Sequence, residues 1–174
     1  METPICDFVK EYADNGFSRF HMPGHKRQKT VDFNPYKIDI TEIEGFDNLH
    51  HAEGVLLEAQ KKAEKLYGSE ESHFLINGST AGILSAVSAC AKKTVLIARN
   101  CHKAVYHAAL IRNLDVYYVY PEIQEEFMLN GGINPADVER SLEEHPEIEA
   151  VVITSPTYDG IVSDVKRIAE IAHA

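Results

Sequence analysis

The segment Asn77-Gly78-Ser79-Thr80 combines residue types that can hold a phosphate group. An apolar strand candidate precedes it, and apolar residues at helical spacing follow it. Such a turn offers free backbone N–H groups and the positive end of a helix dipole to an anion. The Ser and Thr hydroxyls add further donors. The same residues also suit plain capping of the helix by Thr80, so phosphate binding and capping both stay open on this motif alone.

A histidine follows the next predicted strand, in the block Arg99-Asn100-Cys101-His102-Lys103. Open α/β sheets place their ligands just beyond the carboxyl ends of the strands. There His102 can stack its ring on a flat aromatic cofactor or transfer protons. The alternative is that His102 only caps the following helix or lies on the surface.

A third candidate is the hydroxyl-rich turn of residues 154–160, which again lies between a predicted strand and a predicted helix. Ser155 and Thr157 belong to it, and we expect them at the same sheet edge as His102. Taken alone, these residues also make an ordinary turn, because Pro156 and the Asp-Gly pair at 159–160 supply turn geometry.

The spacing of His21 and His25 is that of an HxxxH pair. A zinc site of that kind needs both histidines on one helical face, and Pro23-Gly24 between them disfavours the helix. No carboxylate or thiol is well placed to complete a ligand set. We therefore expect no metal site.

Apolar runs and helical patterns alternate from residue 53 onward, which predicts a largely parallel α/β sheet covered by helices on both faces. Before that point the sequence predicts a short helix and then an extended arm. We therefore divide the chain into residues 1–54, the helix and arm, and 55–174, the α/β part. The expected strands are 73–76, 94–98, 116–119 and 150–154, and the expected helices are 56–66, 80–91, 102–112, 135–144 and one from 163.

Composition narrows the possible partners and location. The chain has 174 residues, with 17 Lys and Arg against 27 Asp and Glu, a net charge of −10. That charge disfavours nucleic acid and anionic membranes as partners. The three scattered cysteines predict no disulfide framework, and no signal peptide or membrane span is visible. We expect a cytoplasmic protein.

From about residue 5 onward, the order of these blocks resembles the major domain of the Orn/Lys/Arg decarboxylases. Two further blocks in the arm and the three segments described above carry the resemblance. They are Phe20-His21-Met22-Pro23-Gly24-His25-Lys26, Asp39-Ile40-Thr41-Glu42 with Asp47-Asn48-Leu49-His50, and the segments at 77–80, 99–103 and 154–160.

The resemblance implies an aspartate-aminotransferase-like fold, a three-layer αβα mostly parallel sheet that binds pyridoxal 5′-phosphate (PLP). It implies that His102 stacks on the pyridine ring, and that His102 and Thr157, which lies close to Ser155, are the catalytic residues. Ser155 would lie near the phenolic oxygen of the cofactor. The implied cofactor-binding residues are Gly78, Ser79, Thr80, His102 and Ser155.

The implied reaction is decarboxylation of arginine, lysine or ornithine to a polyamine or its precursor, in a homodimer or larger homo-oligomer with the arm at the interface. The family's Schiff-base lysine would follow Ala174, so we expect an N-terminal fragment that is inactive alone. Lys103 is no substitute, because its neighbour His102 would cover the opposite face of the ring. The alternatives are an aminotransferase or lyase of the same fold, and a non-catalytic phosphate- or partner-binding domain.

Overall fold

The computed structural model describes residues 14, 16, 18, 34, 37 and 47–174. The predicted first helix, the His21/His25 pair and most of the predicted arm therefore lie outside the described residues. The chain forms two compact units, 1–59 and 60–174. No helix in the described part of the chain is long and apolar enough to cross a membrane.

The sheet of the larger unit is parallel and has the strand order β2-β1-β5, with β1 in the centre. β1 (Thr94–Ala98) pairs over its whole length with β2 (Asp115–Val119). β5 (Val151–Val152) pairs with the middle of β1. Every residue of β1 is buried, as its unbroken apolar sequence predicts for a strand covered on both faces.

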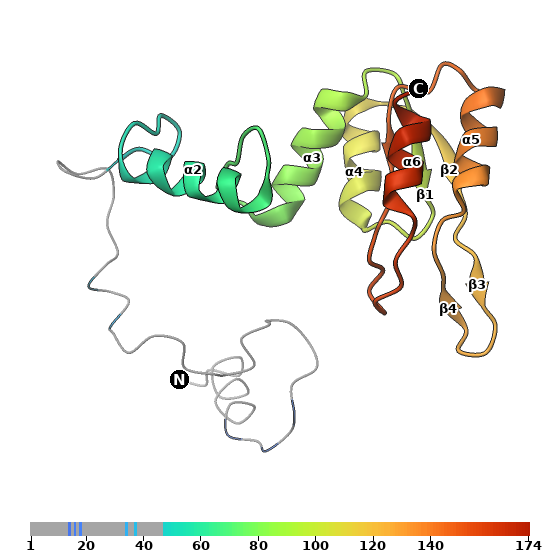
Figure 1. The fold of residues 1–174 in the computed structure, drawn as a ribbon, viewed down its shortest axis with the longest axis horizontal. Coiled ribbons are helices and arrows are strands. Elements are labelled where there is room, and N and C mark those ends of the chain that lie inside the picture. The colour runs from blue at the N-terminus through green and yellow to red at the C-terminus, as the bar shows by residue number, and fades with distance from the viewer. Residues whose placement is uncertain (1–13, 15, 17, 19–33, 35–36, 38–46) are drawn as a thin grey trace, which may run out of the picture. The chain divides into compact units, whose positions relative to one another are not determined.

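Helices pack around this sheet, as Figure 1 shows. α3 (Gly78–Cys90) packs against α4 (Lys103–Arg112), and α5 (Pro135–Glu144) packs against α6 (Val165–Ala172). Together they enclose one apolar core, whose largest fully buried side chains are Leu96, Ile97, Val95 and Val138. The predicted α/β class and its parallel sheet are confirmed.

Side chains at the helix starts explain several boundaries. Asn134 caps α5, because its Oδ1 accepts the Ala136 N–H at 3.0 Å, and proline follows as the first helical residue. Asp164 caps α6 in the same way through the Arg167 N–H at 3.0 Å. Before the sheet, α2 (Val55–Tyr67) is followed by Gly68, whose φ of +66° favours glycine.

The predicted strand at 73–76 is wrong. Residues 73–75 have no regular secondary structure, Ile76 lies in the turn before α3, and none of them pairs with a strand in the described part of the chain. Phe74, Leu75 and Ile76 are 48%, 53% and 68% exposed. The apolar run is strand-like in sequence, but a strand forms only where a neighbouring strand supplies hydrogen bonds.

Two further boundaries differ from expectation. Thr80 does not cap α3, because the helix begins at Gly78 and its N-cap, Asn77, makes no side-chain capping bond. The last predicted strand is reduced from 150–154 to the two residues of β5.

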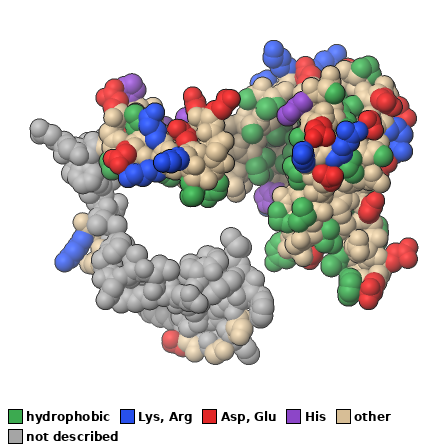
Figure 2. Space-filling model, in the orientation of Figure 1, with side chains coloured by type: hydrophobic (Ala, Val, Ile, Leu, Met, Phe, Trp, Pro, Cys, Tyr) green, Lys and Arg blue, Asp and Glu red, His purple; other side chains and the backbone are tan. Residues whose placement is uncertain are grey.

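The sequence-based interpretation missed an antiparallel hairpin, β3 (Ile123–Gln124) with β4 (Leu129–Asn130). It projects from the sheet beyond the carboxyl end of β2 (Figure 1). Its surface carries acidic and hydrophobic side chains close together (Figure 2), among them exposed Phe127 and Met128. Strands of two residues are too short for an alternating pattern to reveal them.

Candidate functional site

The strand order creates a topological switch point between β1 and β5. The chain leaves β1 for β2 on one side and later returns to β5 on the other. Open α/β sheets bind ligands in the crevice outside the carboxyl ends of such strands. The loop after β1 carries His102, and the loop after β5 carries Ser155 and Thr157. The structure thus brings two of the three predicted segments to the two sides of one switch point.

A thiol and a hydroxyl tie these two loops together. The Cys101 thiol donates to the carbonyl oxygen of Val152 at 3.6 Å, and the Thr154 hydroxyl donates to Cys101 Sγ at 3.5 Å. Burial raises the pKa of the Cys101 thiol, so the thiol stays protonated and keeps its donor role. His102 and Ser155 are the sequence neighbours of this bonded pair.

His102 is the N-cap of α4, as the more conservative interpretation of the sequence proposed. Its Nδ1 accepts the backbone N–H of Ala104 at 3.2 Å, and its side chain is exposed. An Nδ1 that accepts a hydrogen bond carries no proton, so in the neutral ring the proton is on Nε2. Capping therefore fixes the Nδ1 edge of a ring that is otherwise exposed.

The loop after β5 is held by its own hydroxyl groups. Thr157 is buried, and its Oγ1 accepts the Ile161 N–H at 3.1 Å. Its backbone N–H donates to the Ile161 carbonyl at 2.8 Å. Ser155 is half-buried, and its Oγ accepts the Ser163 N–H at 3.1 Å. Both hydroxyls therefore accept within the loop and keep their protons for donation.

The Gly78-Ser79-Thr80 turn opens α3, and a short turn joins the other end of this helix to β1. In Figure 1, α3 slants away from the sheet toward this first turn. All three residues are exposed, and Gly78 has φ +68°. Within the described part of the chain, the backbone N–H groups of these residues make no hydrogen bond. The turn therefore presents unused donors at a helix N-terminus.

Arg99, the first residue of the block at 99–103, makes contacts that the sequence did not predict. Arg99 Nη1 donates to the Tyr106 hydroxyl at 2.9 Å, and its guanidinium carbon lies 5.4 Å and 5.6 Å from the ring centroids of Tyr106 and Tyr118. The hydrogen bond to the Tyr106 hydroxyl and the electrostatic interaction with that group raise the pKa of Arg99 above its already high ordinary value. Sequence spacing gave no signal for this cluster, because the three side chains come from different elements.

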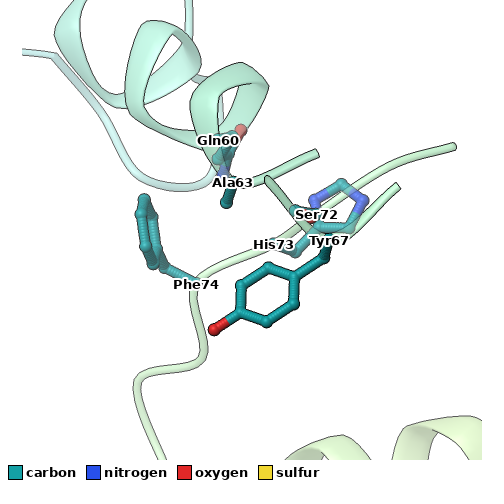
Figure 3. Close-up of a pocket in the computed structure, with 6 residues that line it drawn as sticks. All are labelled: Gln60, Ala63, Tyr67, Ser72, His73 and Phe74. Atoms are coloured by element: carbon teal, nitrogen blue, oxygen red, sulfur yellow. The ribbon is translucent and has the colours of Figure 1, made fainter. Parts of the chain in front are cut away.

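A pocket of about 280 Å³ lies away from these loops, between α2 and residues 72–74 (Figure 3). The rings of Tyr67 and Phe74 flank it, and Gln60, Ala63, Ser72 and His73 complete its lining. None of the predicted site residues belongs to this lining. In the described part of the chain, no cluster of three or more His, Cys, Asp or Glu side chains could hold a metal ion.

Comparison with known proteins identifies the family. Residues 3–174 match the family model described as Orn/Lys/Arg decarboxylase, major domain. The chain is 37% identical to the uncharacterized protein YaaO of Bacillus subtilis, over 99% of this chain and 38% of that protein. It is 31% identical to the arginine decarboxylase of the same organism, over 99% of this chain and 37% of that protein. The chain thus spans less than two fifths of the length of these relatives.

Solved structures agree on the fold. The structure of Escherichia coli constitutive lysine decarboxylase matches 97% of this chain and 27% of its own chain, with a TM-score of 0.67 and 24% identity. This chain belongs to the Orn/Lys/Arg decarboxylase family.

Proposed function

We propose that this chain forms the first part of the cofactor-binding domain of a PLP-dependent decarboxylase acting on a basic amino acid. The observation that carries the proposal is the switch point between β1 and β5. His102 and Ser155 flank it, and Gly78-Ser79-Thr80 offer unused donors at the start of α3. The family membership supports the reaction class.

The residues present fit the chemistry of this cofactor. The N–H groups and hydroxyls of Gly78, Ser79 and Thr80 would hold the phosphate, because a helix N-terminus with unpaired donors favours an anion. Open space surrounds the position where a Cβ would stand on Gly78, so an anion can approach the turn closely. The exposed ring of His102 would stack on the pyridine ring.

The hydroxyls of the β5 loop would orient the cofactor. Ser155 accepts the Ser163 N–H, and its own proton is available to the phenolic oxygen. Thr157 belongs to the same site, where its buried hydroxyl fixes the turn beside Ser155. When bound, PLP supplies the electron sink that lets the α-carboxylate leave as carbon dioxide. The capped His102 ring would exclude water from one face of the pyridine ring.

The substrate class follows from the family, whose named relatives include arginine and lysine decarboxylases. We propose arginine, lysine or ornithine as substrate and a polyamine or its precursor as product. We also propose a cytoplasmic homodimer or larger homo-oligomer. Because the chain spans 38% of YaaO, we expect it to show no turnover by itself.

The phosphate turn provides the direct test. Pyridoxine 5′-phosphate is the probe, because it has the ring and the phosphate but no aldehyde that could react with surface lysines. Ser79→Ala with Thr80→Ala removes two hydroxyl donors, which should weaken binding by about 1.5–3 kcal/mol for each charge-assisted bond lost. Equilibrium dialysis measures the affinity.

Ser85→Ala is the matched control, because Ser85 lies on the same helix, also exposed and beyond the first turn. Its substitution should leave the affinity unchanged. Equal affinity of the unsubstituted chain and the double variant would show that the phosphate binds elsewhere. Phosphate-dependent binding with no turnover by a longer protein would favour a non-catalytic binding domain.

A further inference from the structure

Ser163 makes hydrogen bonds to two separate parts of the fold, the hydroxyl of Ser155 and the backbone of Ile133. Its backbone N–H donates to Ser155 Oγ at 3.1 Å, and its own Oγ accepts the backbone N–H of Ile133 at 2.9 Å. Ser163 is 6% exposed, and Ile133 is also buried. Thirty residues separate Ser163 from Ile133, so this connection exists only in the tertiary structure.

The base of the β3–β4 hairpin holds Ser163 from the other side. A Cβ added to Gly132 would lie 3.3 Å from the Val162 carbonyl oxygen and 3.4 Å from Ser163 Oγ. Gly132 is itself held, because its carbonyl accepts the Glu122 N–H at 3.0 Å. The position of the Ser163 side chain is therefore set by a close backbone approach as well as by a hydrogen bond.

This arrangement decides what the Ser155 hydroxyl can do. A serine hydroxyl has one proton and two lone pairs. The Ser163 N–H occupies one lone pair, which restricts the orientation of the hydroxyl and leaves its proton for donation. If the Ser163 side chain lost its bond to Ile133, the N–H that restrains Ser155 would be free to shift.

We propose that Ser163 is a positioning residue for the cofactor-binding hydroxyl of Ser155. The proposal rests on the proposed function, because it gives Ser155 a donor role toward the phenolic oxygen of PLP. Ser163 itself touches neither cofactor nor substrate. Its bond to Ile133 at the hairpin base fixes its position, and this in turn fixes the N–H group that it donates to Ser155.

A double-mutant cycle with pyridoxine 5′-phosphate tests the coupling in the full 174-residue chain. Ser163→Ala should weaken binding roughly two- to tenfold, the effect of about one neutral hydrogen bond. In a Ser155→Ala background, the same substitution should have no further effect, because the group that it orients is gone. Ser141→Ala is the matched control, because it removes a half-buried hydroxyl that bonds Asp137 on α5 and does not contact the loop.

The absorbance of the bound probe adds a readout that general destabilisation would not change. A donated hydrogen bond favours the ionised 3-hydroxyl, so losing it should raise the pKa of that group on the bound probe. Ser155→Ala and Ser163→Ala should both raise this pKa, whereas Ser141→Ala should leave it unchanged. If Ser163→Ala does not fold, Gly132→Ala disturbs the same contact from the hairpin side and should raise it too.

The outcomes separate this inference from the proposed function. Binding by the unsubstituted chain that is weakened by Ser155→Ala but not by Ser163→Ala would overturn the positioning role alone. The positioning role would also be overturned if the two substitutions weakened the affinity of the double variant by the product of their separate effects. A complete lack of binding by the unsubstituted, folded chain would overturn the proposed cofactor site and the positioning role together.

Discussion

At the residue scale, the carboxylate of Asp47 organises the chain before α2. Its Oδ2 accepts the N–H groups of Gly54 at 2.8 Å and Leu56 at 2.9 Å, and its Oδ1 accepts those of Glu53 and Asn48. These bonds, with Glu53 the largest contributor, lower the pKa of Asp47 from 3.8 to about 2. Asp47 therefore caps α2 from eight residues before its first residue. Asp47, the first residue of the block at 47–50, therefore has a structural role in this chain.

This contact predicts an acid-dependent loosening of the turn. Because the folded pKa of Asp47 is lowered, its stabilisation is present above the ordinary value of 3.8 and is lost as the pH falls toward about 2. An NMR titration of the side-chain carboxyl should give a midpoint near that value. Asp47→Asn should speed amide exchange at Gly54 and Leu56 at neutral pH, whereas substitution of exposed Asp115 by Asn should not. A midpoint near 3.8 would contradict the capping role.

At the element scale, Glu149 joins the turn before β1 to the entry of β5. Its Oε2 accepts three backbone N–H groups, those of Lys92 at 2.7 Å, Lys93 at 2.6 Å and Thr94 at 3.2 Å. Beside it, the Thr94 hydroxyl donates to the backbone carbonyl of Glu147. Since β5 pairs with β1 at only two residues, these contacts keep the two strands aligned.

Replacing this carboxylate should weaken the strand pairing. Three N–H groups, Lys93 foremost, hold the pKa of Glu149 below its ordinary value of 4.5. Its contribution to stability is therefore complete above that value and is lost as the pH falls below it. Glu149→Gln should lower the melting temperature at pH 7 and reduce the further loss of stability on acidification.

The control for that prediction is Glu143→Gln, on the exposed side of α5. It should leave both the melting temperature and its acid dependence close to those of the unsubstituted chain. Equal melting curves for Glu149→Gln and Glu143→Gln across this pH range would show that the carboxylate contributes nothing to the strand alignment.

At the scale of the whole molecule, residues 74–76 are apolar, exposed and in no strand within the described part of the chain. An exposed apolar segment outside any sheet can pack against, or pair with, a strand of another chain. β5 is likewise an edge of the three-stranded sheet. Both features favour association between copies of this chain.

We therefore expect the isolated chain to self-associate. Size-exclusion chromatography with light scattering should show an apparent mass that rises with concentration. Ile76→Lys should shift the chain toward monomer, because it places a charge in the unpaired segment. Ile111→Lys, at a similarly exposed apolar position on α4, should have no such effect. A concentration-independent monomer with a cooperative, high-temperature melt would refute this expectation.

Local sequence patterns predicted most elements correctly. The helix at 135–144 was predicted with its observed bounds, because Asn134 and Pro135 mark its start through contacts made within a few residues. The strands β1 and β2 were also predicted, β1 with its observed bounds and β2 from 116 rather than 115, because each contains a short run of apolar and aromatic residues. The order of the polar blocks was enough to indicate the family, which the family model confirms.

The sequence by itself thus determined the α/β class, the principal helices and the residue types available to a phosphate site. Only the tertiary structure decided which apolar runs become strands, because a strand depends on partners elsewhere in the chain. Residues 74–76 have the composition of a strand and lack such a partner in the described part, whereas β5 has β1. The Ser155–Ser163–Ile133 connection likewise joins distant residues. No local spacing encodes that contact, because it exists only once the hairpin base packs against the loop.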